Sequence, residues 1–337
     1  MPGLGLRKLH MTNPKPVIID TDPGVDDALA LVLALRSPEL RVEAITVVNG
    51  NVSLKRCTQN ALRIVEILGL PDSPPVVPGA DKPLKRAPFS SESIHGRDGL
   101  GEISFLKDRS GKHRYPPPHI KPRKMYAPEL ICEVAARYAG EITLITLGPL
   151  TNVALALELD PRLSHNIREI ITMGGAYSVP GNVTPAAEFN FYCDPEAARQ
   201  VIQSGIPVVL VGLDVTRNAR LSRHRLLQAA KKRTRLNRFL QDSTERVMNV
   251  YREREGYHGC PLHDALAVMV AIDRSSVGTK FVHVDIETDG TLTSGMSVTD
   301  LRPFFRGEAG RPNAHVAVWV DPDRFQQFLL ERIIDNL

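Results

Sequence analysis

Residues 17–30, VIIDTDPGVDDALA, decide the fold expected of this chain. An apolar, β-branched run leads into DTD at residues 20–22, PG turns the chain, and DD at residues 26–27 opens an Ala/Leu-rich helix. Four carboxylates within eight residues are costly to bury unless a cation lies among them. A hard divalent cation bound by oxygen ligands is therefore the expected partner of this stretch.

A simpler alternative is that these acids only cap the helix and face solvent. The positive end of the helix dipole stabilises a carboxylate in the first turn, which would account for Asp26 or Asp27. It would not account for Asp20 and Asp22, which belong to the strand. Of these two, Asp20 is expected to be structural and to anchor neighbouring loops.

Strand-like and helix-like segments alternate outward from this stretch. The strand at 17–22 is followed by a helix at 25–36, a strand at 41–48 and a helix at 54–68. This rhythm predicts parallel βαβ units, and so an α/β fold with an open, mostly parallel, doubly wound sheet and helices on both faces. Ligands bind beyond the carboxyl ends of such strands, where the acidic stretch is found.

The same alternation resumes after residue 127 and continues to the C-terminus. Further helices are predicted over 129–139, 153–159, 195–204, 221–241, 243–255, 260–272 and 323–334, and strands over 142–147, 167–173, 207–211, 281–287 and 314–320. Several of these last segments are expected to form a small additional C-terminal β element that is antiparallel.

Three stretches describe the expected domain organisation. Residues 1–16 have no apolar core of the secretory type and are expected to form a disordered lead. Residues 17–337 are expected to form a single domain. Within it, residues 71–127 are rich in Pro, Lys and Arg and are expected to be a long surface excursion or lid, mobile over 105–126.

Composition argues against several classes of protein. A net charge of +4 over 337 residues gives no concentrated basic stripe for nucleic acid. Four scattered cysteines without a CxxC pair argue against a zinc site or disulfide framework and fit a reducing compartment. No apolar run approaches the length of a membrane span. The expectation is a cytoplasmic protein without nucleic-acid or membrane partners.

Two further stretches carry polar residues suited to a binding site. Asn182, Glu188 and Asn190 are interleaved with apolar residues in a loop without helical period, which suits a polyhydroxylated ligand or, alternatively, Asx-turns. His263 and Asp264 open an apolar helix. They are either a cap, or a third carboxylate at the cation with a histidine able to act as an acid near neutral pH.

An ordered series of motifs resembles the inosine–uridine-preferring nucleoside hydrolases. The series is DTDPGVDDA at 20–28, TVVNGN at 46–51, LGPLTN at 147–152, MGG at 173–175, AEFN at 187–190, DPEAA at 194–198, VGLDVT at 211–216 and HDALAV at 263–268. The resemblance covers most of residues 17–320 and implies hydrolysis of ribonucleosides to ribose and nucleobase on an open α/β fold. It also implies a tightly held Ca²⁺ and a homodimer or homotetramer.

The resemblance implies a role for each matching residue. Three carboxylates and one backbone carbonyl would hold Ca²⁺: Asp22, Asp27, Asp264 and Leu147. Asp22 would also be the general base for the metal-bound water. Five side chains would hold the ribose hydroxyls: Asp26, Asn51, Asn182, Glu188 and Asn190. His263 would protonate the leaving base.

Two more residues are candidates for contact with the nucleobase. His95 lies in a loop that resembles a lid, and Tyr257 immediately precedes the predicted 260–272 helix; both are otherwise plain loop residues. The sequence does not predict a purine or a pyrimidine preference.

Two other functions remain open from the sequence. A phosphohydrolase of the haloacid dehalogenase type also begins with an apolar strand and an Asp-x-Asp motif, but usually continues Asp-Gly-Thr rather than Pro-Gly-Val. A non-catalytic nucleoside or ribose sensor could keep the same fold, although Asp22 and His263 argue against it.

Overall fold

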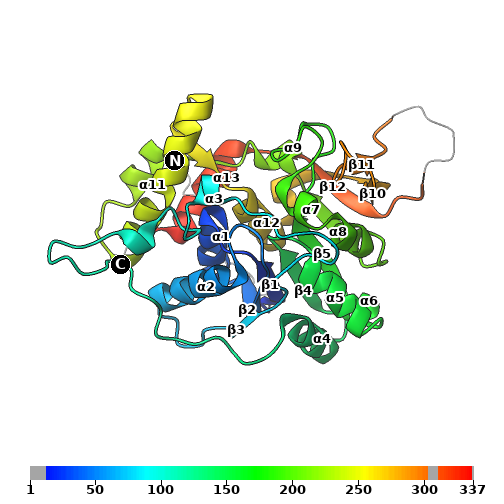
Figure 1. The fold of residues 1–337 in the computed structure, drawn as a ribbon, viewed down its shortest axis with the longest axis horizontal. Helices are drawn as coiled ribbons and strands as arrows, with labels where there is room; N and C mark the ends of the chain where they lie inside the picture. The colour runs from blue at the N-terminus through cyan, green and yellow to red at the C-terminus, as the bar shows by residue number, and fades with distance from the viewer. Residues whose placement is uncertain (1–12, 303–309, 336–337) are drawn as a thin grey trace, which may run out of the picture.

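A sheet of eight strands forms the centre of the computed structural model, which describes residues 13–302 and 310–335 (Figure 1). Its strands run in the order β3 (Val76–Pro78), β2 (Leu40–Val47), β1 (Lys15–Thr21), β4 (Ile142–Thr146), β5 (Ile167–Met173), β6 (Val208–Val211), β12 (Ala314–Val320) and β9 (Val277–Val282). All neighbours pair in parallel except β12 and β9, which are antiparallel. The predicted open, mostly parallel sheet is confirmed.

Helices cover both faces of this sheet with two apolar clusters. One face carries α1 (Val25–Leu35), α2 (Leu54–Leu68), α11 (Arg235–Glu255), α12 (His263–Ile272) and α13 (Pro322–Ile333). The other carries α4 (Ala127–Tyr138), α5 (Thr151–Leu159) and α8 (Pro195–Ile202). Because α1 also packs against α11, α12 and α13, its apolar residues are buried nearly all round.

Short elements connect these layers. They are α3 (Glu92–His95), η1 (Ile103–Phe105), α6 (Leu163–Asn166), α7 (Phe189–Cys193), α9 (Leu213–Thr216), β7 (Arg220–Ser222), α10 (Arg223–Ala229), β8 (Gly259–Pro261), η2 (Arg274–Ser276), β10 (Val284–Ile286) and β11 (Ser297–Thr299). The pairs β7–β8 and β10–β11 form two small antiparallel sheets. No helix in the described ranges is both long and apolar enough to cross a bilayer.

The predicted small C-terminal β element is confirmed, but the two strands predicted in this part of the chain are distributed differently. The strand predicted over 314–320 is β12, but it extends the main sheet because it pairs with β6. The strand predicted over 281–287 is divided between β9, on the edge of the main sheet, and β10. Among the described C-terminal residues, β10 and β11 form the small separate antiparallel element.

Three predicted helices have wrong boundaries. Residues 221–241 contain part of β7, then α10, and only the beginning of α11, whose N-cap is the Thr234 side chain. This helix then runs unbroken to Glu255, because Ser243 and Thr244 are buried in it rather than ending it. The predicted 260–272 helix begins at His263, since Cys260 and Pro261 pair with β7.

The two predicted irregular stretches contain regular structure. Residues 1–12 of the predicted lead lie outside the described residues, whereas Lys15 and Pro16 already pair with β2. The predicted excursion at 71–127 contains β3, which pairs with β2 at the sheet edge.

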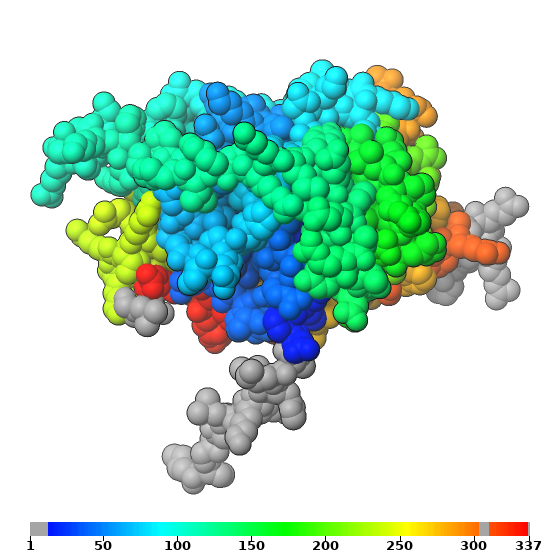
Figure 2. All heavy atoms as spheres, turned by 90° about the horizontal axis from the view of Figure 1, so that it is seen from below, coloured from blue at the N-terminus to red at the C-terminus, as the bar shows by residue number. Residues whose placement is uncertain are grey.

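Residues 105–126 run over the outside of the molecule, as the turquoise chain in Figure 2 shows. Tyr115 from this segment is only 5% exposed, and its O–H donates to Asp242 of α11 over 2.7 Å. The backbone N–H of His119 donates to Glu66 of α2 over 2.6 Å. The segment is therefore attached to both α2 and α11.

Candidate active site

A cavity of about 590 Å³ lies beyond the carboxyl ends of the strands and has the size of a small-molecule site. It collects most of the residues that the sequence singles out. Those that line it are Asp26, Asn51, His95, Leu147, Asn182, Glu188, Asn190, His263 and Asp264. They come from strand ends, from the loop after β5 and from the first turns of α1 and α12.

Buried carboxylates converge at the floor of this cavity. Oxygens of Asp26, Asp27 and Asp264 all lie within 4.8 Å of one another, so these three residues could hold a metal ion. Burial raises the pKa of Asp26 to about 6, and burial with repulsion from Asp26 and Asp27 raises the pKa of Asp264. The sequence placed Asp26 at the ribose instead, and the structure puts it among the closest carboxylates as well as in the cavity wall.

Asp22 lies fully buried beside this group. Its Oδ2 accepts from the backbone N–H of Asn51 over 2.6 Å, whereas its Oδ1 is buried with no hydrogen-bond partner in the described residues. Burial, with repulsion from Asp27, raises its pKa well above the ordinary value. An unpartnered carboxylate oxygen among like charges is the environment that a cation would relieve, so these residues fit a divalent metal ion.

Two glycines let the chain approach the Asp22 carboxylate. A Cβ at Gly50 would lie 2.0 Å from Oδ2, and one at Gly148 would lie 2.5 Å from Oδ1. Any side chain at either position would therefore displace the carboxylate. The NG and LG pairs at the ends of β2 and β4 are explained by this close approach.

The neighbouring Asp20 has the structural role that the sequence predicted. Its Oδ1 accepts from Thr46 Oγ1 over 2.6 Å and from Asn152 Nδ2 over 2.8 Å. Asn152 in turn accepts from the backbone N–H of Ala80. Asp20 thereby ties β1 to β2, α5 and the loop after β3.

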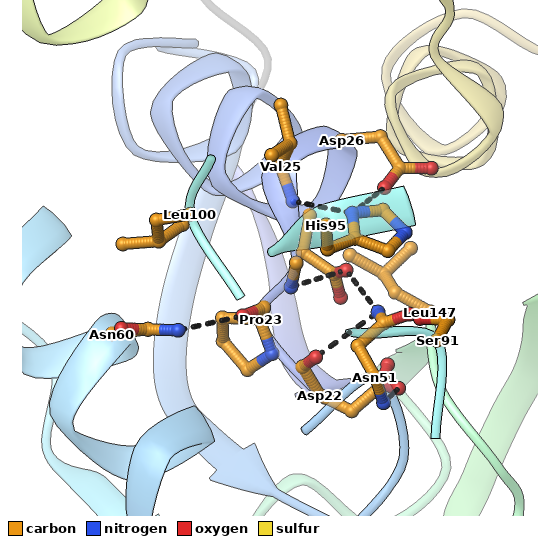
Figure 3. Close-up of polar contacts among 12 residues, drawn as sticks. Asp22, Pro23, Val25, Asp26, Asn51, Asn60, Ser91, His95, Leu100 and Leu147 are labelled. Carbon is orange, nitrogen blue, oxygen red and sulfur yellow. Dashed lines mark hydrogen bonds and ion pairs between the residues drawn. The ribbon is translucent and has the colours of Figure 1, made fainter. Parts of the chain in front are cut away.

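Asn51 has a fixed orientation at the edge of the acidic group. Its Oδ1 accepts from Ser91 Oγ over 2.5 Å, so its Nδ2 is free to donate to Asp27 Oδ2 and to the carbonyl of Asp22, each over 3.1 Å (Figure 3). Thr21 Oγ1 and the backbone N–H of Gly24 also donate to Asp27. These donors partly offset the repulsion among the acids.

The loop after β5 supplies the opposite side of the floor. Glu188 caps α7 and accepts from the backbone N–H groups of Gly175 and Asn190 over 3.0 and 2.9 Å, while burial raises its pKa to about 7. Asn190 Nδ2 donates to the carbonyl of Leu147 over 2.7 Å. Asn182 Oδ1 accepts from the backbone N–H of Phe189. The loop is therefore held rigidly by its own polar side chains.

Two histidines, His95 and His263, line the cavity, and burial lowers the pKa of each. His95 Nδ1 accepts from the backbone N–H of Val25 over 3.1 Å and lies 3.9 Å from Asp26, as Figure 3 shows. The neutral ring therefore carries its proton on Nε2. His263 Nδ1 is 2.8 Å from Thr216 Oγ1, and burial, with repulsion from His95 and two arginines, lowers its pKa to about 3.

The remaining wall is formed by residues that the sequence reading missed. Helix α11 contributes Val247, Val250 and Tyr251, and the loop after α9 contributes Arg217. Val247 and Tyr251 are four residues apart and so share one face of α11, but this spacing does not distinguish a face that lines a cavity from one that packs against the core. Tyr257, the predicted contact, is absent from the lining found among described residues, and its ring packs under the Arg220 guanidinium at 4.6 Å instead.

Comparison with known proteins agrees with this arrangement. The family model described as inosine-uridine preferring nucleoside hydrolase matches residues 17–327. The pyrimidine-specific ribonucleoside hydrolase RihA of Salmonella gallinarum is 40% identical over 319 residues, covering 94% of this chain and 98% of that protein.

Solved structures are similar over the same length. A plant nucleoside hydrolase has a TM-score of 0.84 at 34% identity and covers 95% of this chain and 99% of its own. A purine-preferring ribonucleoside hydrolase of Gardnerella vaginalis has a TM-score of 0.85 at 33% identity, with coverages of 95% and 98%. None of these comparisons supports the phosphohydrolase or sensor alternatives. The chain belongs to the inosine-uridine preferring nucleoside hydrolase family.

Proposed function

We propose that this protein hydrolyses the N-glycosidic bond of ribonucleosides to ribose and free nucleobase, with Ca²⁺ as its metal. The observation that carries the proposal is the unpartnered Oδ1 of Asp22 beside three converging carboxylates. Ca²⁺ prefers carboxylate and carbonyl oxygens, and the proposed ligands are Asp22, Asp27, Asp264 and the carbonyl of Leu147. When bound, the ion would lower the pKa of a water molecule and orient it.

The residues around the ion have three proposed roles in the reaction: proton acceptance, stabilisation of charge on the ribosyl group, and binding of the ribose hydroxyls. Asp22 takes the proton from the attacking water, as general base. The ribosyl group becomes oxocarbenium-like in the transition state, and the surrounding carboxylates stabilise its positive charge. Ribose hydroxyls are held by Asp26, Asn51, Asn182, Glu188 and Asn190, all of which line the cavity.

The leaving base needs a proton or another means of stabilising its charge. His263 remains the proposed donor because it lines the cavity and its Nδ1 is already engaged by Thr216, which leaves Nε2 for a ligand. Its lowered pKa makes the resting imidazole neutral at pH 7, and a neutral ring can only donate a hydrogen bond through Nε2–H. To protonate the base, His263 must first take up a proton and become imidazolium, which the negative charge developing on the departing base would favour. His95, with its proton on Nε2, is proposed to donate a hydrogen bond to the base.

Relatives differ in base preference by name, one being pyrimidine-specific and another purine-preferring. The substrate class proposed here is therefore ribonucleosides, without a narrower base. A homodimer or homotetramer is also proposed, from the family resemblance, and size-exclusion chromatography with light scattering measures it. A cytoplasmic location stays a prediction.

The test is ribose release from a panel of purine and pyrimidine ribonucleosides, with and without chelator. We expect release from at least one ribonucleoside, lost with chelator and restored by added Ca²⁺. Binding of ribonucleosides without any release would instead support a sensor. Phosphate release from phosphate esters, with no nucleobase liberated, would support the phosphohydrolase.

A further inference from the structure

Asn60 of α2 connects two parts of the active site without lining the cavity. The residue is 2% exposed. Its Nδ2 donates to the carbonyl of Pro23 over 3.0 Å, as Figure 3 shows, and to the carbonyl of Asp98 over 2.7 Å. Pro23 directly follows Asp22, and Asp98 lies three residues after His95. One amide group therefore joins the carboxylate turn to the histidine loop.

The chemistry of the amide fixes its orientation. An asparagine amide has two N–H donors, and the two carbonyls use both. Its Oδ1 instead faces the Arg63 guanidinium, at 3.4 Å from Nη1. A flipped amide would direct Oδ1 at the two carbonyl oxygens, so three buried acceptor oxygens would face one another with no donor between them. Asn60 is therefore held in one state by contacts on both of its sides.

The histidine loop behaves as one unit beyond this link. The Asp98 carboxylate accepts from three backbone N–H groups, those of Leu100, Glu102 and Ser104, at 2.8–2.9 Å. The backbone N–H of Gly101 donates to the carbonyl of His95 over 2.8 Å. These bonds connect Asp98 to His95 through the loop backbone, so we expect a shift of Asp98 to move His95 as well.

The loop also packs closely against the turn. Gly99 has φ +81, and a Cβ there would lie 2.9 Å from Asn60 Nδ2 and 3.2 Å from the Pro23 carbonyl. Two hydrogen-bonded links therefore join the turn and the loop: the Asn60 amide, and the bond from the Val25 N–H to His95 Nδ1. The first does not involve the histidine ring, whereas the second does, as does the 3.9 Å approach of Nδ1 to Asp26.

We propose that Asn60 is a positioning residue that sets the distance of His95 from the carboxylate turn. By holding the loop at Asp98, it keeps the His95 ring where Val25 can occupy Nδ1 and Nε2–H faces the ligand. This inference rests on the proposed function for its kinetic consequence. The tautomer of His95 in the resting protein is a consequence that does not depend on turnover.

The kinetic test compares Asn60→Leu, which keeps the size and removes both donors, with Thr58→Val on the same helix. Thr58 is also buried, and its Oγ1 donates within α2 to the carbonyl of Leu54. We expect Asn60→Leu to lower kcat/KM for a ribonucleoside about 10- to 100-fold, by misplacing a group in the site. Thr58→Val should stay within about twofold, with a similar melting temperature.

A double-mutant cycle separates positioning from general loosening of the fold. In a His95→Ala background, Asn60→Leu should cost at most about twofold in kcat/KM. An equal loss in both backgrounds, or no loss in the wild-type background, would overturn the proposal. If Asn60→Leu does not fold, Asn60→Ala takes its place, because it also removes both donors and introduces no larger side chain, and the same outcomes apply.

Nitrogen-15 NMR of the histidine side chains gives a readout without substrate. We expect a single Nε2–H tautomer for His95 in the wild type and in Thr58→Val, and mixed tautomers in Asn60→Leu. An unchanged tautomer in Asn60→Leu would overturn the positioning role even if activity fell. If no ribonucleoside is hydrolysed by the wild type, the proposed function fails while this NMR result still decides the role of Asn60.

Discussion

The floor of the cavity and the α11 wall are built in opposite ways. The floor comes from strand ends and helix N-termini, and its carboxylates are buried and connected by short hydrogen bonds. The wall comes from Val247, Val250 and Tyr251 on a long helix that is largely exposed toward its C-terminal end. Buried carboxylates are therefore concentrated where the sugar is proposed to bind. Where the base is proposed to bind, α11 presents Val247, Val250 and Tyr251 together with the charged Arg254 and Glu255.

This difference predicts which part of the site tolerates amino-acid substitution. A buried, connected floor tolerates almost no substitution, since each change leaves a partner unsatisfied. A helix face that presents apolar side chains can exchange them with little effect on the fold. We infer that the floor carries the shared chemistry and the wall the base preference, in agreement with relatives that differ by name in preference.

The largest effect is expected at the floor. Asp22→Ala should lower kcat for ribonucleosides about 10³-fold or more, because both the general base and a proposed metal ligand are lost. Circular dichroism should show a folded protein. Asp108→Asn, in an exposed loop, is the charge-matched control and should keep wild-type kcat. Near-normal turnover by Asp22→Ala would remove it from the role of base.

The second test concerns the repulsion among the acids. Without metal, Asp264→Asn should melt at or above the wild-type temperature, because it removes one charge from a crowded buried group. Added Ca²⁺ should stabilise the wild type by about 2.7 kcal/mol at a hundredfold excess over Kd. The variant should lose this response. Equal Ca²⁺ stabilisation of both proteins would argue against Asp264 as a ligand.

The third test concerns His263, which is proposed to act on the leaving base next to the sugar site. His263→Ala should reduce kcat/KM for inosine about 100-fold, since the leaving base loses its proton donor. The loss on p-nitrophenyl riboside should be much smaller, because p-nitrophenolate leaves without protonation. Steady-state kinetics on both substrates measure the difference. Losses of equal size would mean that His263 acts on the sugar rather than on the leaving group.

The smallest effect is expected on the wall, where two tyrosines form a matched pair. Tyr251→Ala should raise KM about 10-fold through lost contact with the base. Tyr257→Ala should change KM less, about twofold, because Tyr257 does not line the cavity and reaches it only through Arg220, a lining residue on which its ring packs. The reverse ranking would show that the loop before β8 reaches the base when a substrate is bound.

The sequence predicted the floor better than the wall for a physical reason. Helix 54–68 was found with its exact residues because its apolar spacing is strong and Gly69, with φ 59, ends it. The carboxylates of the β1–α1 turn were found because strand ends of a parallel sheet share one edge. By contrast, α11 was divided at residue 242, since its buried Ser243 and Thr244 resemble a helix start.

Short stretches of sequence predict the order of the elements and the class of the sheet, because periodicity and turn residues act over a few residues. They also predict a bound cation, because the acidic residues are crowded within one short stretch. Asp20, Asp22 and Asp27 could be recognised there. The wall residues and the Asn60 link depend on contacts between distant parts of the chain. Asn60 lies 37 residues from Pro23 and 38 from Asp98, and only packing of α2 against both segments brings one amide within reach of two carbonyls.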